Sequence, residues 1–78
     1  MTIETRWLVY PDGDRQETSH VLSIDQLVDM NGQEIHPPLH NPRMIAYRVW
    51  KIRRAEERGM LDVLQYLSLV PASELQAL

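Results

Sequence analysis

Two of the three histidines have the spacing of a metal site. His36 and His40 lie four residues apart, and on a helix this spacing would align both imidazoles on one face. Pro37 and Pro38 stand between them, however, and consecutive prolines are incompatible with a helix here. A zinc site also needs further converging ligands, and the candidates are His20, Asp29 and Glu34. We therefore predict exposed loop histidines, with no bound metal and no other cofactor.

The sequence lacks the side-chain constellations of known catalytic sites. It has no cysteine, no glycine-rich phosphate loop and no nucleophile elbow. Ser19 and His20 are neighbours, but adjacent residues on a strand point to opposite faces and cannot form a nucleophile–base pair. An EF-hand loop starting at Asp12 would need Gly at its sixth and Glu at its twelfth position, and the sequence has neither. We predict that the protein is not an enzyme.

Positive charge and aromatic side chains coincide in residues 43–58. This segment carries six Lys or Arg and two Glu, in a chain whose net charge is −3. Basic residues release counterions from phosphates and aromatic faces stack on unpaired bases, a combination typical of surfaces that bind single-stranded nucleic acid. The same side chains could instead pack on a sheet, with arginine stems over the rings, or meet acidic groups of a protein. The candidate contact residues are Arg43, Tyr47, Arg48, Trp50, Lys51, Arg53, Arg54 and Arg58.

The secondary structure of this segment has two interpretations. An Asn-Pro start and a Gly end would suit a helix over 42–58. The composition favours a strand over 43–54, because most of its central residues are β-branched or aromatic. The strand also gives residues 60–70 a partner, across a loop at 55–59. Basic and aromatic residues share faces in both interpretations.

Two further hairpins are indicated in the first half of the chain. Residues 2–10 alternate in the manner of a half-buried strand, and a Pro-Asp-Gly turn connects them to a second strand at 16–22. Asn31-Gly32 lies between two short apolar stretches and predicts a two-residue turn of type I′.

The remaining elements are short. Residues 23–28 are ambiguous, and a helical turn capped by Ser23 is one option. After Pro71, residues 72–78 predict a terminal helix with Leu75 and Leu78 facing the body.

These features predict one small domain over residues 1–78. Its expected fold is mainly β, a small antiparallel sheet or barrel of two hairpins, 2–10/16–22 and 43–54/60–70, with a short C-terminal helix. The alternative is an α+β fold with a helix at 42–58. No disulfide is possible and no apolar run is long enough to suggest a membrane span, so we expect a cytoplasmic protein without a membrane partner.

The predicted function is that of a small protein-interaction or accessory module. Its partner would be another protein or a second copy of the chain, because acidic and basic regions are segregated along the sequence. The alternative is binding of single-stranded RNA or DNA through residues 43–58.

Overall fold

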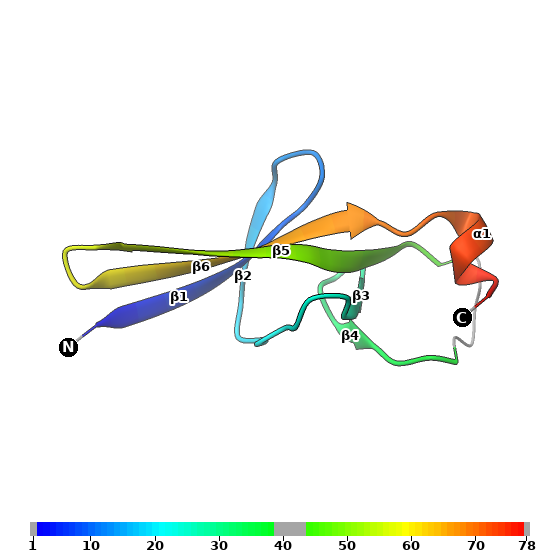
Figure 1. The fold of residues 1–78 in the computed structure, drawn as a ribbon, viewed down its shortest axis with the longest axis horizontal. Helices are drawn as coiled ribbons and strands as arrows, with labels where there is room; N and C mark the ends of the chain where they lie inside the picture. The colour runs from blue at the N-terminus through cyan, green and yellow to red at the C-terminus, as the bar shows by residue number, and fades with distance from the viewer. Residues whose placement is uncertain (1, 39–43, 78) are drawn as a thin grey trace.

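The structure is a computed structural model that describes residues 2–38 and 44–77, and one curled sheet dominates it (Figure 1). Six strands lie in the order β2-β1-β6-β5-β3-β4, and a short helix follows the last strand in sequence. The elements are β1 (Ile3–Val9), β2 (Arg15–Thr18), β3 (Leu27–Asp29), β4 (Glu34–Ile35), β5 (Ala46–Glu57), β6 (Met60–Leu69) and α1 (Ala72–Leu75).

The sheet is mixed where an antiparallel one was expected, because β1 and β6 run parallel whereas the other four neighbouring pairs are antiparallel. The predicted mainly β fold is confirmed, since both expected hairpins are present as β1–β2 and β5–β6 and a short helix follows them. The parallel pair joins strands from opposite ends of the chain. Such a pair needs a long crossover, which the chain from β2 to β5 supplies. The result is a half-barrel instead of a flat sheet.

β5 decides between the two interpretations of the basic segment. It is a strand from Ala46 to Glu57, so the alternative helix at 42–58 is wrong. The predicted loop at 55–59 is also too long, because only Arg58 and Gly59 connect β5 to β6. Both residues have positive φ, 50° and 81°. That is the geometry of a type I′ turn, whose twist matches the flanking strands.

The Asn31-Gly32 hairpin is present, but its predicted turn type is wrong. The carboxylate of Asp29 accepts hydrogen bonds from the backbone N–H of Asn31 (2.8 Å) and of Gln33 (2.9 Å), which organises a longer loop. Only Gly32 in this loop has positive φ, at 80°. A Cβ on Gly32 would lie 2.6 Å from Leu8 Cδ1, so glycine is required both by conformation and by packing.

Residues 23–28 form a tight turn followed by β3. The backbone N–H of Gln26 donates to Ser23 O at 3.1 Å, and Asp25 has a φ of 73°. The optional helical turn is therefore wrong. A residue with positive φ at the third turn position is the signature of a type II turn.

The main core lies on one face of the sheet, which we call the inner face. Its buried residues are Leu8, Leu22, Val28, Val49 and Leu67. Residues 19–23, whose first four were expected to continue the second strand, instead cross this face. Gln65 anchors them: its side chain accepts a hydrogen bond from Leu22 N at 2.8 Å and donates to His20 O at 3.3 Å. A buried amide with partners of this kind fixes how the crossing segment lies.

A second core cluster seats the C-terminal helix. Leu75 packs with Leu27, Ala46 and Val70, all of them buried. The predicted inward position of Leu75 is confirmed, whereas Leu78 lies outside the described residues.

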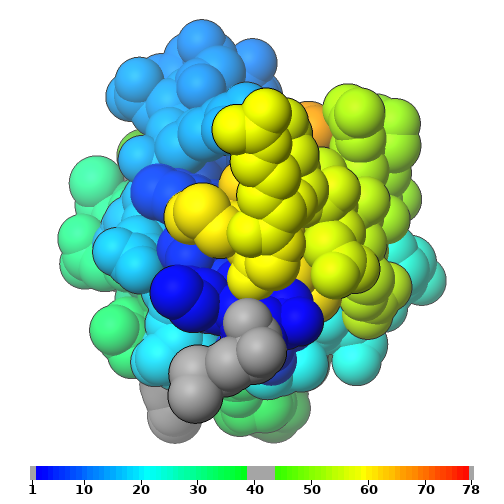
Figure 2. Space-filling view, turned by 90° about the vertical axis from the view of Figure 1, so that its left-hand side faces the viewer, coloured from blue at the N-terminus to red at the C-terminus, as the bar shows by residue number. Residues whose placement is uncertain are grey.

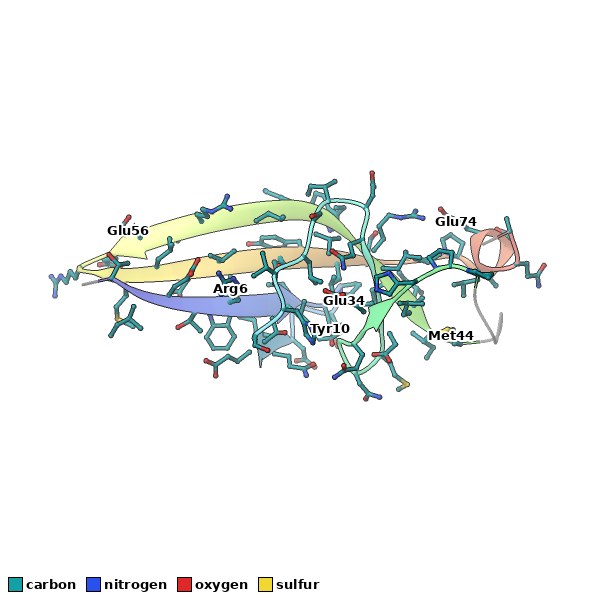
Figure 3. All side chains as sticks on the ribbon, turned by 90° about the horizontal axis from the view of Figure 1, so that it is seen from below. Arg6, Tyr10, Glu34, Met44, Glu56 and Glu74 are labelled. Carbon is teal, nitrogen blue, oxygen red and sulfur yellow. The ribbon has the colours of Figure 1, made fainter. Side chains whose placement is uncertain are left out.

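Beyond these cores the sheet continues as a narrow projection, which we call the distal arm. It consists of residues 3–5 of β1, 50–57 of β5 and 60–64 of β6 (Figure 1, left). The molecule measures 45 × 21 × 18 Å, and its radius of gyration is 13.6 Å, where a compact chain of this length would have about 11.5 Å. Figure 3 shows Glu56 near the tip of the arm and Glu74, a residue of α1, at the opposite end.

Candidate functional site

Two of the candidate contact residues, Tyr47 and Arg48, have partners within the fold. Tyr47 packs edge to face on Tyr10, with ring centroids 5.2 Å apart. The guanidinium of Arg48 bonds to the carboxylate of Glu74 at 2.6 Å, which ties β5 to α1. That hydrogen bond is also the main reason why the pKa of Arg48 lies above its ordinary value. Arg43 lies outside the described residues.

A β-bulge places Trp50 on the surface. The β5–β6 register shifts between Val49 and Lys51, which leaves Trp50 as the extra residue with 56% of its surface exposed. Bulges commonly redirect a side chain in this way. The Trp50 ring lies 6.1 Å from that of Tyr66, and Lys51 Nζ stands 5.9 Å from the first ring centre and 5.6 Å from the second. We call these three residues the Trp50 cluster.

The remaining arginines are exposed and spread apart. Arg53, Arg54 and Arg58 form no ion pair with any residue that the structure describes. Arg53 lies opposite Leu64 and Arg54 opposite Val63, so their side chains leave opposite faces of the arm. Arg58 lies in the turn between β5 and β6. The structure thus brings Trp50 and Lys51 together but does not gather the arginines around them.

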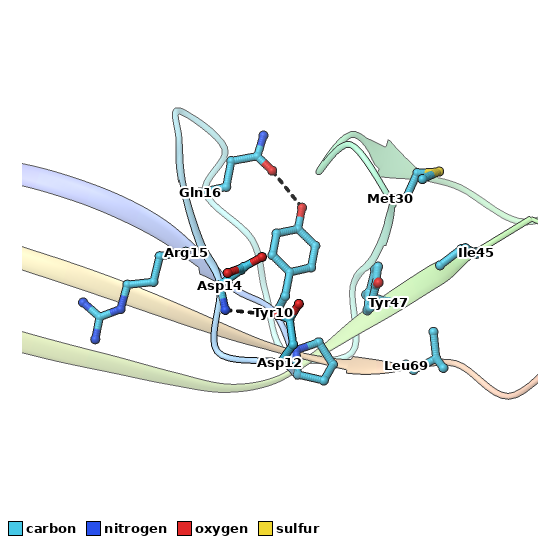
Figure 4. Close-up of a pocket in the computed structure, with 10 residues that line it drawn as sticks. Tyr10, Asp12, Asp14, Arg15, Gln16, Met30, Ile45, Tyr47 and Leu69 are labelled. Atoms are coloured by element: carbon cyan, nitrogen blue, oxygen red, sulfur yellow. Dashed lines mark hydrogen bonds between the residues drawn. The ribbon is translucent and has the colours of Figure 1, made fainter.

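A groove that was not predicted lies beside the β1–β2 turn. Its volume is about 750 Å³, and Figure 4 shows how the lining side chains surround Tyr10. Its apolar walls are unusually open: Met30 is 60%, Ile45 47% and Leu69 59% exposed. The lining residues of this Tyr10 groove are Tyr10, Pro11, Asp12, Asp14, Arg15, Gln16, Met30, Ile45, Tyr47 and Leu69.

The rim of the Tyr10 groove is acidic on balance. Its lining includes two acidic residues, Asp12 and Asp14, and one basic residue, Arg15. The Tyr10 hydroxyl donates to Gln16 Oε1 at 2.9 Å. Burial raises the pKa of Tyr10, and the neighbouring Tyr47 and Asp29 raise it further.

A second hollow borders the same turn and includes Trp50 and Tyr66. Its volume is about 550 Å³, and it shares Tyr10, Pro11 and Leu69 with the Tyr10 groove. The two hollows are therefore adjacent, with Asp12 and Asp14 lining the first and Trp50, which Lys51 Nζ approaches, lining the second.

The pattern of residue types could not reveal this surface. The Pro-Asp-Gly sequence predicts the β1–β2 turn, but its contact with Met30 and Ile45 depends on how the sheet curls. The sequence gives one indication of the groove: it has more apolar residues than one buried face of the sheet can cover.

Two of the three histidines, His20 and His36, lie near the carboxylate of Glu34. His20 Nδ1 lies 3.9 Å and His36 Nε2 3.6 Å from Glu34, and His36 is exposed as predicted. Among residues 2–38 and 44–77, no three His, Asp or Glu side chains are grouped closely enough to hold a metal ion. His40 is outside this set. Within the same residues, no helix has the length and apolarity needed to cross a membrane.

The fold and this surface define a small, elongated mixed-β domain with a curled sheet and an exposed apolar groove. A family model described as an uncharacterised Treponema protein matches residues 2–78, and the chain belongs to this family. No curated protein and no solved structure is significantly similar to it.

Proposed function

We propose that the protein is a non-catalytic protein-binding module and that the Tyr10 groove holds an apolar side chain of a partner, followed by a Lys or Arg. The observation that carries the proposal is the exposure of Met30, Ile45 and Leu69 around one groove. Contiguous exposed apolar surface with a polar rim is characteristic of protein interaction sites.

The charge around the groove selects the kind of partner. Asp12 and Asp14 both line the groove, while Arg15 points away from Tyr10 in Figure 4. Phosphates would be repelled there, whereas a basic residue beside the apolar anchor would be attracted. An extended peptide segment supplies both groups at neighbouring positions.

Selection from a random peptide library tests this directly. We expect wild-type protein to enrich peptides with a Leu, Met or aromatic residue next to Lys or Arg, and Leu69→Lys to lose those peptides. Val21→Lys is the matched control, because Val21 is 67% exposed and does not line the groove. Enrichment that is unchanged by Leu69→Lys would contradict the proposal.

A charge reversal sharpens the test. Asp14→Lys should shift the enriched peptides from basic toward acidic residues beside the same apolar anchor. If the preference for basic residues persists, the rim does not select the partner. Cytoplasmic location remains a prediction from the composition.

A second candidate function is binding of single-stranded nucleic acid, and the Trp50 cluster is the observation that favours it. An exposed Trp beside a Tyr and a Lys provides a stacking platform with one cation. With oligo(dT) at about 50 mM salt we would expect quenching of Trp fluorescence that Trp50→Ala abolishes and Arg48→Ala, already paired with Glu74, largely preserves. Absence of quenching would remove this candidate.

A further inference from the structure

One long edge of the sheet has no partner strand among the described residues. β3 pairs with β5 only as far as Arg48, and Val49 still bonds through its backbone to Asp25 and Gln26. From Trp50 to Glu57, β5 pairs only with β6. In Figure 3 this part of β5 forms one border of the distal arm, with no ribbon beyond it. An end-on view shows the same residues at the surface (Figure 2, yellow-green).

The turn geometry tells which backbone groups point outward along this edge. A two-residue type I′ turn makes its flanking residues, Glu57 and Met60, a hydrogen-bonded pair. Pairs alternate along an antiparallel ladder, so Ala55 also bonds toward β6. Arg54 and Glu56 therefore direct their N–H and C=O groups to the free edge. Such a row of unpaired groups is a template for another strand.

The side chains on this edge are self-complementary. β5 reads Arg53-Arg54-Ala55-Glu56-Glu57, two bases and two acids on either side of an alanine. If two copies meet antiparallel about Ala55, Arg54 of each copy faces Glu56 of the other, and Arg53 faces Glu57. Four opposite-charge cross-strand pairs result, and each contributes favourably to pairing.

Other registers lack this match. Because the outward backbone groups alternate, only registers centred on a residue let both copies exchange hydrogen bonds. Centring on Arg53 or Arg54 places two like-charged arginines opposite each other, and centring on Glu56 does the same for two glutamates. Like charges directly opposite are destabilising. The Ala55 register alone satisfies both the backbone and the charges.

From the free edge and its charge pattern, we infer that the protein forms a symmetric dimer through β5, with Ala55 on the two-fold axis. The two sheets become continuous across the interface, which covers the exposed edge. The contact is small and its ion pairs are exposed, so the dimer is weak and salt weakens it further. The Tyr10 groove lies outside the interface and stays available.

Sedimentation equilibrium at low salt, from micromolar to millimolar protein, measures the association. We expect a monomer–dimer equilibrium for the wild type. The double variant Arg53→Glu/Arg54→Glu places acids opposite acids, and Glu56→Arg/Glu57→Arg places bases opposite bases. Each should weaken dimerisation about tenfold or more, because four attractive pairs become repulsive.

The decisive experiment mixes the two double variants. Their β5 edges are complementary in the Ala55 register, so an equimolar mixture should form a heterodimer where neither variant dimerises alone. The quadruple variant, with all four charges reversed, should dimerise like the wild type. All four side chains are exposed, and circular dichroism checks that each variant is folded.

A wild type that stays monomeric across the whole range would overturn the inference. So would a dimer that survives both double variants, since it would have to form through α1 or the Tyr10 groove. Leu69→Lys separates the two proposals: it should abolish peptide selection and leave the β5 dimer unchanged.

Discussion

The two halves of β5 belong to one strand yet differ in nearly every physical respect. Ala46–Val49 lies between β3 and β6, and Ala46 and Val49 are fully buried. Its two polar side chains are engaged, Tyr47 by Tyr10 and Arg48 by Glu74. We call this part the proximal half.

The second half begins at the bulge. From Trp50 to Glu57 the strand has one neighbour instead of two, and most of its side chains are exposed. Both parts contain an aromatic residue directly followed by a basic one, Tyr47-Arg48 in the proximal half and Trp50-Lys51 beyond the bulge. The comparison teaches that neighbouring strands, and not composition, decide whether an arginine or a tryptophan stabilises the fold or stays available for a partner.

The largest expected effect concerns the core behind the proximal half. Leu67 lies opposite Val49 and is 2% exposed, so Leu67→Ala leaves a cavity and should lower the free energy of unfolding by about 2–5 kcal/mol. Leu69→Ala, at a position 59% exposed on the same strand, should change it by less than about 0.5 kcal/mol. Urea unfolding measures both. Equal losses would mean that the two positions are buried alike.

A smaller effect is expected where the crossing segment is anchored. Gln65→Leu leaves the buried N–H of Leu22 without its acceptor, which should cost about 1–3 kcal/mol. Gln16→Leu removes hydrogen bonds to Tyr10 and Asn31 at an exposed site and should cost less than about 1 kcal/mol. Hydrogen exchange of the Leu22 amide provides a local measurement. If that amide stays as protected as in the wild type, Gln65 does not hold the segment.

The smallest expected effect on stability concerns the arginines in the two halves of β5. Arg48→Gln breaks the partly exposed ion pair with Glu74 and should cost about 0.2–1 kcal/mol. Arg54→Gln should change the stability of dilute, monomeric protein by no more than about 0.5 kcal/mol, because Arg54 has no ion-pair partner among the described residues. Thermal unfolding at several salt concentrations distinguishes them: only the Arg48 difference should shrink with salt. A reversed order would contradict the division of β5 at its bulge.

Part of the fold follows from local patterns. The β-branched and aromatic residues of 45–52 correctly favour a strand over a helix, and the Pro-Asp-Gly and Pro71 positions end elements as predicted. Asn31-Gly32 marks a hairpin, but the Asp29 side chain changes its turn. The type I′ turn forms instead at Arg58-Gly59, which allows β5 to continue to Glu57.

The candidate site could be predicted only in part from the same patterns. Residues 43–58 contain Trp50 and Lys51, which the structure brings together, and also Tyr47 and Arg48, which the fold engages internally. A strand alternation read from the sequence assigns Trp50 to a face, but the bulge shifts that alternation at Trp50 itself. Such an insertion arises from pairing with β6 and has no local signature.

The amino-acid sequence by itself determined that this protein is built of strands, where its chain turns, and that bases and acids flank Ala55 in a self-complementary order. These properties depend on side-chain shape, backbone preference and charge at neighbouring positions. Only the tertiary structure decided that β1 pairs parallel with β6, that the Tyr10 groove opens, and that β5 has a free edge beyond Val49. Each of these depends on contacts between segments distant in sequence, whose pairing is chosen by the packing of the whole sheet and not by any one strand.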